Sequence, residues 1–337
     1  MNSEVSFTRY VKYAQAVAQL GFFSTTISCS ILIYLTMFRV KRNFGTYKYL
    51  MILFPLFGIF FATLEFVLYP NIYSHNAAYI YYSINRPFGI GKEAVVWLLA
   101  LYGGMYGFTT SLLSVQFLYR YWAIFYESKI KYFKGYKFLI WIFYSLVFGA
   151  LWAGGLVFFL EIDEYSENYL SRSMKEKCNV NFSEIAGMAL VAYNSDGSLR
   201  WLNISCTINM TLIMLVLYTV MLYCAARMNF EMEEKLQMVS EYLRDMHRQF
   251  YKTLILQIVT PTLILFLPVI FIIYIPLLNL EADIPTGIFL CALTVYPAMD
   301  AIIVMYVVKD YRKAVRNTLE KLVFRVYAWL IKPGPGD

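Results

Sequence analysis

Histidine and charged residues are scarce in this chain, and their scarcity removes several classes of function. Only 2 of the 337 residues are histidine and 15% are charged, whereas soluble globular proteins carry about 25% charged residues. His75 and His247 both fall in predicted loops, which excludes a histidine-based active site or zinc site inside a membrane. The five cysteines form no Cys-x-x-Cys pair. We expect no catalytic residue, no metal, no cofactor, no enzyme activity and no nucleic-acid partner.

Long apolar stretches are abundant instead, since 60% of the residues are hydrophobic. A helix needs about 20 apolar residues to cross a bilayer, and backbone groups in lipid must be bonded within the helix. The stretches never show the alternation of a membrane β-barrel. We therefore predict an all-α fold, a bundle of seven transmembrane helices. The predicted spans are Ala14–Phe38, Tyr49–Tyr69, Ala94–Tyr121, Phe138–Leu160, Trp201–Ala226, Thr253–Pro276 and Thr286–Val308.

The loops between these spans carry most of their basic residues on one side of the membrane. The side that includes the C-terminal tail has 21 Lys and Arg, and the side that includes the N-terminus has 8. Because short basic loops stay in the cytoplasm, we predict that the N-terminus lies outside. We call the two ends of the bundle the outer end and the inner end on this basis.

The second outer loop contains two residues with possible covalent chemistry. Asn181 opens the sequence Asn-Phe-Ser, an acceptor for N-glycosylation. Cys178 is the only cysteine in a predicted loop. One interpretation pairs it in a disulfide with Cys206, at the outer end of the fifth span. The other treats both cysteines as small buried hydrophobic residues.

A few ionisable or amide side chains fall inside the predicted spans: Glu65, Gln116, Arg120 and Asp300. Such residues are costly in a bilayer, so each is a functional hypothesis. One interpretation is that the acidic residues join helices through hydrogen bonds to neighbouring hydroxyl and amide groups. For Asp300 a switching role is equally open. No lysine accompanies them within the spans, so they do not resemble a charge-paired transport pathway.

The outer half of the third span combines aromatic, hydroxyl and small residues. Tyr102, Tyr106, Phe108 and Thr109 stand among glycines there. One interpretation is an aromatic pocket wall with hydroxyl groups, suited to a small, weakly polar ligand. The other is ordinary helix packing through small residues, together with the interfacial aromatic belt.

Proline residues mark the sixth and seventh spans as the natural hinged elements. Pro261, Pro268 and Pro276 lie in the sixth span and Pro297 in the seventh. Each removes a backbone hydrogen bond and bends the helix.

Two amphipathic patterns lie on the inner side. Apolar residues at helical spacing from Met232 to Phe250 predict that the fifth and sixth helices extend into the cytoplasm. The tail places Val315 and Leu319 on one face of a helix with basic residues on the rest. This predicts a short helix lying on membrane lipid of the inner leaflet. We therefore predict that the chain consists of a receptor domain, residues 1–308, and a cytoplasmic tail, residues 309–337.

Several short motifs, in their order and spacing, resemble the nematode serpentine chemoreceptors of the Str type, a group that includes the diacetyl odorant receptor. The resemblance extends from about Lys41 to Arg316. Its motifs are Gly45-Thr46-Tyr47-Lys48, Tyr119-Arg120-Tyr121-Trp122, Gln257-Ile258-Val259-Thr260-Pro261, Tyr296-Pro297-Ala298-Met299-Asp300 and Lys309-Asp310-Tyr311-Arg312.

The resemblance implies a G-protein-coupled receptor for a small odorant or pheromone, in the plasma membrane and specifically in the ciliary membrane of chemosensory neurons. Tyr119, Arg120 and Tyr121 would form the switch on the side of the heterotrimeric G protein. Tyr296, Pro297 and Asp300 would be the counterpart on the seventh helix. The family usually has proline after that aspartate, and Ala301 stands here, so we expect a straighter helix at this point.

The leading hypothesis is thus a chemosensory, specifically olfactory, receptor. The alternative is a seven-helix ligand-gated ion channel of the insect odorant receptor kind, which has its N-terminus inside and so conflicts with the distribution of basic residues. A transporter or intramembrane enzyme is a third possibility, and the chain lacks the inverted repeats or catalytic clusters that either would need.

Overall fold

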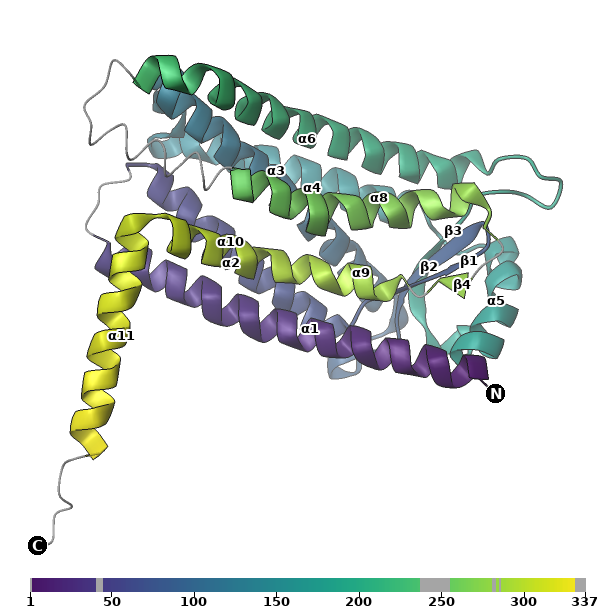
Figure 1. Ribbon diagram of the computed structural model, residues 1–337. Helices are drawn as coiled ribbons and strands as arrows, with labels where there is room; N and C mark the ends of the chain where they lie inside the picture. The colour runs from purple at the N-terminus through teal and green to yellow at the C-terminus, as the bar shows by residue number, and fades with distance from the viewer. Residues whose placement is uncertain (1, 41–44, 237–254, 281–282, 285, 331–337) are drawn as a thin grey trace, which may run out of the picture.

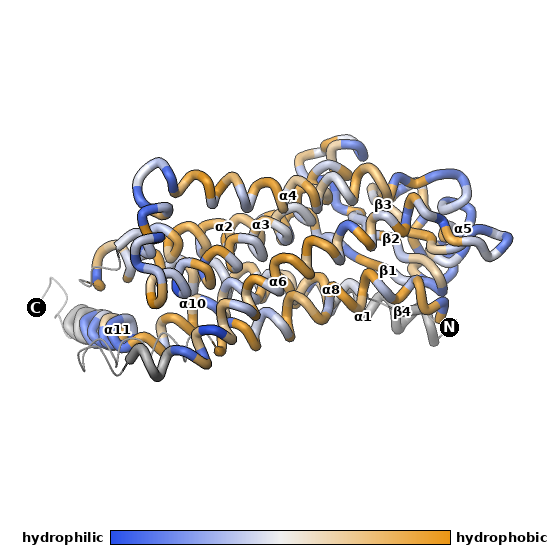
Figure 2. Tube along the Cα trace, turned by 90° about the horizontal axis from the view of Figure 1, so that it is seen from above, coloured by the Kyte–Doolittle hydropathy of each residue, from blue (hydrophilic) through white to orange (hydrophobic). Residues whose placement is uncertain are grey.

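The computed structural model describes residues 2–40, 45–236, 255–280, 283–284 and 286–330. These segments form an elongated bundle of helices with a small sheet at one end (Figure 1). Hydrophobic residues predominate along the bundle and hydrophilic residues gather at its two ends (Figure 2). This distribution suits a protein whose middle lies in the hydrocarbon of a bilayer.

Within the described residues, seven helices are long and apolar enough to cross a membrane, which confirms the predicted number and order of spans. The N-terminus lies at the end that carries the sheet (Figure 1). The spans are Tyr13–Arg39, Tyr47–Leu68, Lys92–Phe125, Gly135–Phe159, Trp201–Glu231, Ile255–Leu278 and Phe289–Val307. The first five lie within α1 (Asn2–Tyr34) with η1 (Leu35–Arg39), α2 (Tyr47–Leu68), α3 (Lys92–Phe125), η4 (Gly135–Phe138) with α4 (Leu139–Phe159), and α6 (Trp201–Leu236).

The third helix, α3, is the central one, because 78% of the residues in its apolar stretch are buried inside the protein. It lies against α4 at backbone distance because the contact is made by glycine. A Cβ atom added to Gly104 would lie 2.9 Å from the carbonyl oxygen of Gly149, and one added to Gly107 would lie 3.0 Å from that of Phe148. Small residues allow this close approach. In a bilayer the hydrophobic effect does not drive helices together, so close packing of this kind stabilises the helix pair.

The sixth and seventh spans are interrupted near their prolines. The sixth is helical over 255–261 and widens into a π-helical segment directly after Pro261. The seventh contains a 3₁₀ segment before Pro297, and its last part continues without interruption past Ala301. In order, these spans contain η6 (Thr262–Phe266), α8 (Leu267–Tyr274) and η7 (Ile275–Leu278), then α9 (Gly287–Cys291), η8 (Ala292–Val295) and α10 (Tyr296–Val307).

A four-stranded sheet covers the outer end, and the prediction of an all-α fold did not include it. All three outer loops contribute to it, in the order β3-β2-β1-β4, with antiparallel pairing throughout. The first two strands form a hairpin whose turn places Asn76 at a φ of 48°, a conformation that asparagine tolerates. The strands are β1 (Asn71–His75), β2 (Ala78–Ser83), β3 (Ala186–Val191) and β4 (Asp283–Ile284).

The two faces of this sheet belong to different cores, because side chains alternate across a strand. Tyr79 and Tyr81 of β2 join the main core of the helix bundle. Ile80 and Tyr82 join a second core beneath the helix α5 (Glu164–Cys178). The sheet with α5 on its outer face therefore closes the outer end of the bundle, and we call this unit the lid.

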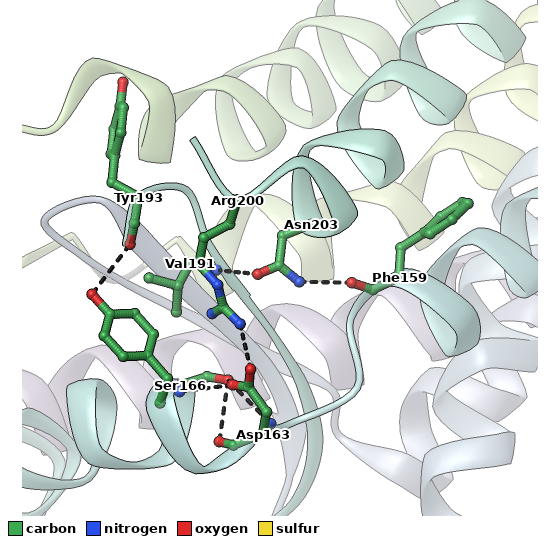
Figure 3. A network of polar contacts seen from close by, with 8 residues as sticks. Phe159, Asp163, Ser166, Val191, Tyr193, Arg200 and Asn203 are labelled. Atoms are coloured by element: carbon green, nitrogen blue, oxygen red, sulfur yellow. Dashed lines mark hydrogen bonds and ion pairs between the residues drawn. The ribbon is translucent and has the colours of Figure 1, made fainter. Parts of the chain in front are cut away.

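A polar network fixes the lid to the top of the transmembrane helices (Figure 3). Arg200, just before α6, forms an ion pair with Asp163, which caps the N-terminus of α5 by accepting from the backbone N–H of Ser166 at 2.9 Å. Asn203 lies three residues further along, in the first turn of α6. Its side chain donates to the carbonyl oxygen of Phe159 at 2.7 Å and accepts from the N–H of Val191. These contacts join α4, α5, β3 and α6.

The Asp163 carboxylate gives the lid an acid dependence whose direction can be stated. Burial acts to raise the pKa of Asp163, but hydrogen bonds from Ser166 and the charge of Arg200 outweigh it and lower the pKa below its ordinary value of 3.8. A lowered pKa in the folded state means that the contribution to stability is present above 3.8 and is lost as the pH falls through the folded value. We expect Asp163→Asn to flatten the acid limb of the melting temperature of the purified receptor. An unchanged acid limb would contradict this assignment.

The inner end continues into α11 (Lys309–Leu330), which turns away from the bundle axis (Figure 1). Tyr311 fixes its start, since its hydroxyl lies 2.8 Å from that of Thr36 at the end of the first span. Leu319 and Val323 are exposed, as a helix on a lipid surface requires. The apolar pattern predicted from Met232 to Phe250 falls mostly outside the described residues, although α6 does continue to Leu236.

The disulfide considered between Cys178 and Cys206 is not formed in the structure. All five cysteines lie in described segments, and no disulfide joins any two of them. Cys178 belongs to the core between α5 and the sheet, whereas Cys206 belongs to the core of the helix bundle. Their placement agrees with the other interpretation, that of small buried hydrophobic residues.

Candidate functional site

A cavity lies in the outer half of the bundle, beneath the lid. Its volume is about 60 Å³, counted as the space that the centre of a water molecule can occupy. Its lining side chains are apolar or aromatic and come from the sheet and from five of the seven spans. They are Ile72, Tyr79, Tyr81, Tyr102, Gly103, Tyr106, Trp152, Leu156, Met210, Val269, Ile272, Ile273, Leu290 and Leu293.

Tyrosine hydroxyls are the polar groups of this cavity, and three of them bond to the surrounding helices. Tyr81 donates to the carbonyl oxygen of Leu99 at 3.0 Å, and Tyr106 donates to that of Leu265 at 3.2 Å. Tyr102 donates to a carboxylate oxygen of Glu65 at 2.8 Å. Burial raises the pKa of Tyr81 well above its ordinary value, so this lid tyrosine stays protonated and neutral.

The bond from Tyr106 is important because of where Leu265 lies. Leu265 belongs to η6, the π-helical segment that interrupts the sixth span. Short π-helical segments occur frequently at functional sites. Tyr106 also packs on Trp152, with the two ring centroids 4.7 Å apart. A molecule in the cavity would thus touch a side chain that is directly bonded to the irregular part of the sixth helix.

The four residues suggested as ligand contacts divide into two groups. Tyr102 and Tyr106 line the cavity, whereas Phe108 and Thr109 do not. Phe108 faces another side of α3 and packs on Phe57 with ring centroids 4.4 Å apart. Thr109 shares the face of Tyr102 but lies seven residues further along, about 10 Å deeper in the bundle. Helical spacing would have separated Phe108 from the two tyrosines.

The lid residues of the cavity were absent from the suggested ligand contacts. Tyr79 and Tyr81 reach it from β2, on the face of the sheet that meets the bundle. The run Tyr79-Ile80-Tyr81-Tyr82 is rich in aromatic and β-branched residues, which favour strands. It is too short to span a membrane.

Glu65 lies beside the cavity, joining α2 to α3 through Tyr102. Its side chain has no exposure. Besides Tyr102, the Thr294 hydroxyl and the Cys291 thiol of the seventh span lie within hydrogen-bonding reach of its carboxyl group. Glu65 therefore also joins α2 to the seventh span beside the cavity.

At the inner end, Arg120 is the centre of a buried polar network that joins four helices. Its Nε donates to the hydroxyl of Tyr47 on α2 at 2.8 Å. Its Nη1 donates to the side-chain oxygen of Gln257 in the sixth span, and the Gln257 amide donates in turn to Asp300 on α10. Arg120, Gln257 and Asp300 are 7%, 1% and 4% exposed, so these bonds lie away from water, where they are stronger.

The structure therefore brings together Arg120 and Asp300, which the sequence analysis placed in separate motifs. Gln257 is the link between them, and it was quoted as part of a motif without being assigned a role. A lone amide side chain in an apolar helix was the available signal, because such groups form hydrogen bonds between helices in membranes.

The other suggested switch residues lie around this network. Tyr119 stacks on Tyr47 with ring centroids 5.1 Å apart, and Tyr121 meets Tyr223 of α6 edge to face. Tyr296 is fully buried one helical turn from Asp300. Pro297 lies outside these contacts, and its carbonyl oxygen accepts from the Cys29 thiol. Gln116, noted only as a polar residue within a span, is buried in α3 one turn before Arg120.

A bundle of seven helices with an aromatic cavity at its outer end and an arginine-centred network at its inner end has the architecture of a G-protein-coupled receptor. Comparison with known families gives the particular group. The family of serpentine type 7TM GPCR chemoreceptors named Str matches residues 14–316. The chain therefore belongs to the Str family of chemoreceptors, as its motifs suggested.

Individual relatives agree with this assignment. The chain is 34% identical over 307 residues to the G-protein coupled receptor str-33 of Caenorhabditis elegans, covering 89% of each chain. It is 25% identical over 301 residues to the serpentine receptor class r-10 of the same species, covering 88% of each. These relatives are named as receptors, and membership of their family makes this chain a multi-pass membrane protein of the receptor class. The ion-channel alternative receives no support.

Proposed function

We propose that this receptor detects a small, weakly polar odorant or pheromone in the outer cavity and signals through a heterotrimeric G protein at the inner end. The observation that carries the proposal is the placement of Tyr102, Tyr106 and Arg120. Tyr102 and Arg120 are 18 residues apart on α3, five helical turns, and therefore share one face of the helix. One rigid helix thus connects the cavity to the inner network over about 27 Å.

The size of the cavity limits the ligand. A water molecule needs about 10–15 Å³ of such space, so 60 Å³ holds the equivalent of a few waters. An occupant of a few heavy atoms, mainly apolar and with one hydrogen-bonding group, fits the apolar lining and the tyrosine hydroxyls. Volatile compounds have this character, which supports an olfactory role. Membership of the chemoreceptor family makes the ciliary membrane of chemosensory neurons the location that we propose for it.

Signalling would follow from a shift between two arrangements of the sixth helix. A ligand stabilises whichever arrangement it contacts better. Contact with Tyr106 would alter its bond to Leu265 in the π-helical segment, and the inner part of the same helix carries Gln257. Movement there would separate Gln257 from Arg120 and Asp300 and expose the inner end of α3 to a G protein.

The direct test is a panel of odorants and pheromones applied to cells that express the chain, with intracellular calcium as the readout. A response that depends on the receptor supports the proposal. If no compound in a broad panel raises calcium while the receptor is present at the cell surface, the proposal fails. A tag at each terminus tests the orientation, and an N-terminal tag inside the cell would contradict it.

Replacing Tyr106 by phenylalanine should weaken the transmission from the cavity to the sixth helix. The change removes only the hydroxyl and its bond to Leu265, which contributes about 0.5–1.5 kcal/mol. We expect a several-fold rise in the half-maximal concentration of an agonist found in the panel, with surface expression unchanged. Tyr49→Phe is the matched control, since Tyr49 is 60% exposed and distant from the cavity. Equal responses of both variants would refute the coupling role of Tyr106.

A further inference from the structure

A second hollow lies on the lipid-facing side of the bundle, between α6 and the sixth span. We call it the groove. It offers about 410 Å³ to the centre of a water-sized molecule. One wall comes from α6 and includes Met214 and Leu215, and the other comes from η6 and α8 and includes Phe266, Leu267 and Ile270. The helices α6 and α8 lie side by side in both views (Figures 1 and 2).

Hydroxyl pairs hold the two walls together at either end of the groove. Thr211 and Tyr274 lie 3.0 Å apart, oxygen to oxygen, and so do Tyr218 and Thr262. The two α6 members of these pairs are seven residues apart, about 10 Å along the helix. Between the pairs the walls are apolar, and the groove is open along that length to the hydrocarbon of the bilayer.

The groove leads inward to the cavity. The groove residues that face the lipid, Leu215, Leu267 and Ile270, are 61%, 50% and 41% exposed. The groove residues that face the bundle interior, Met214, Phe266 and Ile273, are buried. Ile273 lines both the groove and the cavity, and Met210 of the cavity lies one turn from Met214 of the groove.

The wall between the two spaces is therefore made of a few apolar side chains. Methionine has three rotatable bonds and adapts its shape, and Ile273 extends from the helix that η6 interrupts. A ligand that came from the water outside would have to pass the lid. The lid closes the outer end with a hydrogen-bonded sheet under α5. Opening the lid would break strand pairing, whereas opening the groove needs only side-chain rotation.

We propose that ligands reach the cavity from the bilayer, through the groove, with Ile273 as the gate. This rests on the proposed function, in which the cavity is the ligand site. It adds to that function the chemical class of the ligand: a lipid-soluble compound that concentrates in the hydrocarbon before it binds. The volume of the cavity limits the size of such compounds. The groove admits compounds that pass directly from the hydrocarbon into the protein, without a hydration shell.

The route can be tested without a known ligand, by photolabelling the full-length receptor in phosphatidylcholine nanodiscs. The probe is a small dialkyl diazirine dissolved in the bilayer. On irradiation it loses N₂, and the resulting carbene inserts into a nearby C–H or O–H bond. Mass spectrometry then compares adducts on cavity residues, such as Tyr102 and Leu293, with adducts on the lipid-exposed residues Phe158 and Tyr306, which are 74% and 70% exposed.

Two variants block the groove from opposite walls, Leu215→Trp on α6 and Ile270→Trp on α8. We expect each to reduce cavity adducts several-fold while adducts at Phe158 and Tyr306 stay unchanged. Leu212→Trp and Leu263→Trp are the matched controls, because both residues are lipid-exposed and neither lines the groove. Both controls should retain the cavity adducts.

Two results would overturn the proposal. Cavity adducts that persist in both groove variants would mean that the probe passes through the lid. Adducts in the wild-type groove with none in the cavity would mean that the groove holds only lipid chains. Neither result depends on signalling, so the failure of this proposal is distinguishable from a receptor that responds to no odorant. Unchanged surface adducts and melting temperature show that a variant is folded.

Discussion

Replacing Arg120 by alanine is expected to abolish ligand-evoked signalling while surface expression stays near normal. The substitution removes the donors to Tyr47 and Gln257 at once, so the buried hydrogen bonds from α3 to Tyr47 and to the sixth span are lost at the inner end. Asp300 keeps the Gln257 amide as its donor and is not left without any hydrogen bond. The receptor should therefore fold, but its inner end should lose the network that distinguishes its two arrangements.

The measurement is agonist-evoked calcium together with surface labelling of an N-terminal tag. Arg120→Lys retains the positive charge, but one ammonium group does not reproduce the planar guanidinium fork, and we expect it to restore little of the response. Arg39→Ala is the matched control. Arg39 also lies at the inner end, but it bonds to Thr318 of α11 and should signal normally. A wild-type response from Arg120→Ala at equal surface density would remove Arg120 from the mechanism.

Replacing Gly104 by leucine should prevent α3 and α4 from packing and reduce the folded receptor at the cell surface severely. The first side-chain atom would already meet the Gly149 carbonyl oxygen at 2.9 Å and the Ala153 Cβ at 3.0 Å. Backbone cannot rotate away as a side chain can, so the helices must separate. Overpacking of this kind typically costs about 1–3 kcal/mol and occasionally more, a large part of the stability of a protein.

Gly154→Leu on the partner helix separates this steric effect from any general intolerance of glycine substitution. A Cβ added to Gly154 meets only the ring of Phe158, at 3.7 Å, an ordinary contact distance. Leucine also has a better helix propensity than glycine, so this control should express like wild type. Thermal unfolding of both purified variants measures the difference. If the two melt alike, the close approach of α3 and α4 does not govern stability.

The transmembrane architecture could be predicted because it depends on local sums. Hydropathy over about 20 residues locates a span wherever that span packs. The loop charges likewise predict its orientation. The predicted spans agree with the structure to within a few residues at most ends. The importance of Arg120 and Asp300 was also accessible, since a polar side chain in an apolar stretch is conspicuous regardless of its partners.

The lid was not predicted because its strands are short and contributed by three separate loops. The residues of β1 pair with β2 nearby in sequence but also with β4, more than 200 residues away. The same reason applies to the cavity, whose lining combines Tyr81 of the lid, Trp152 of α4 and Leu293 of the seventh span. Spacing along one helix suggested Tyr102 and Tyr106 but could not show where the cavity ends, and so it also included Thr109.

The sequence by itself determined that this protein crosses the membrane seven times, which residues are costly to bury and which family it belongs to. Each of these follows from the composition or order of residues close together in the chain. Only the tertiary structure decided that Gln257 joins Arg120 to Asp300, that the outer loops form a closed lid, and that Ile273 stands between a cavity and a groove open to lipid. Those properties arise from contacts between residues distant in sequence, and the geometry of such contacts is set by how the helices pack.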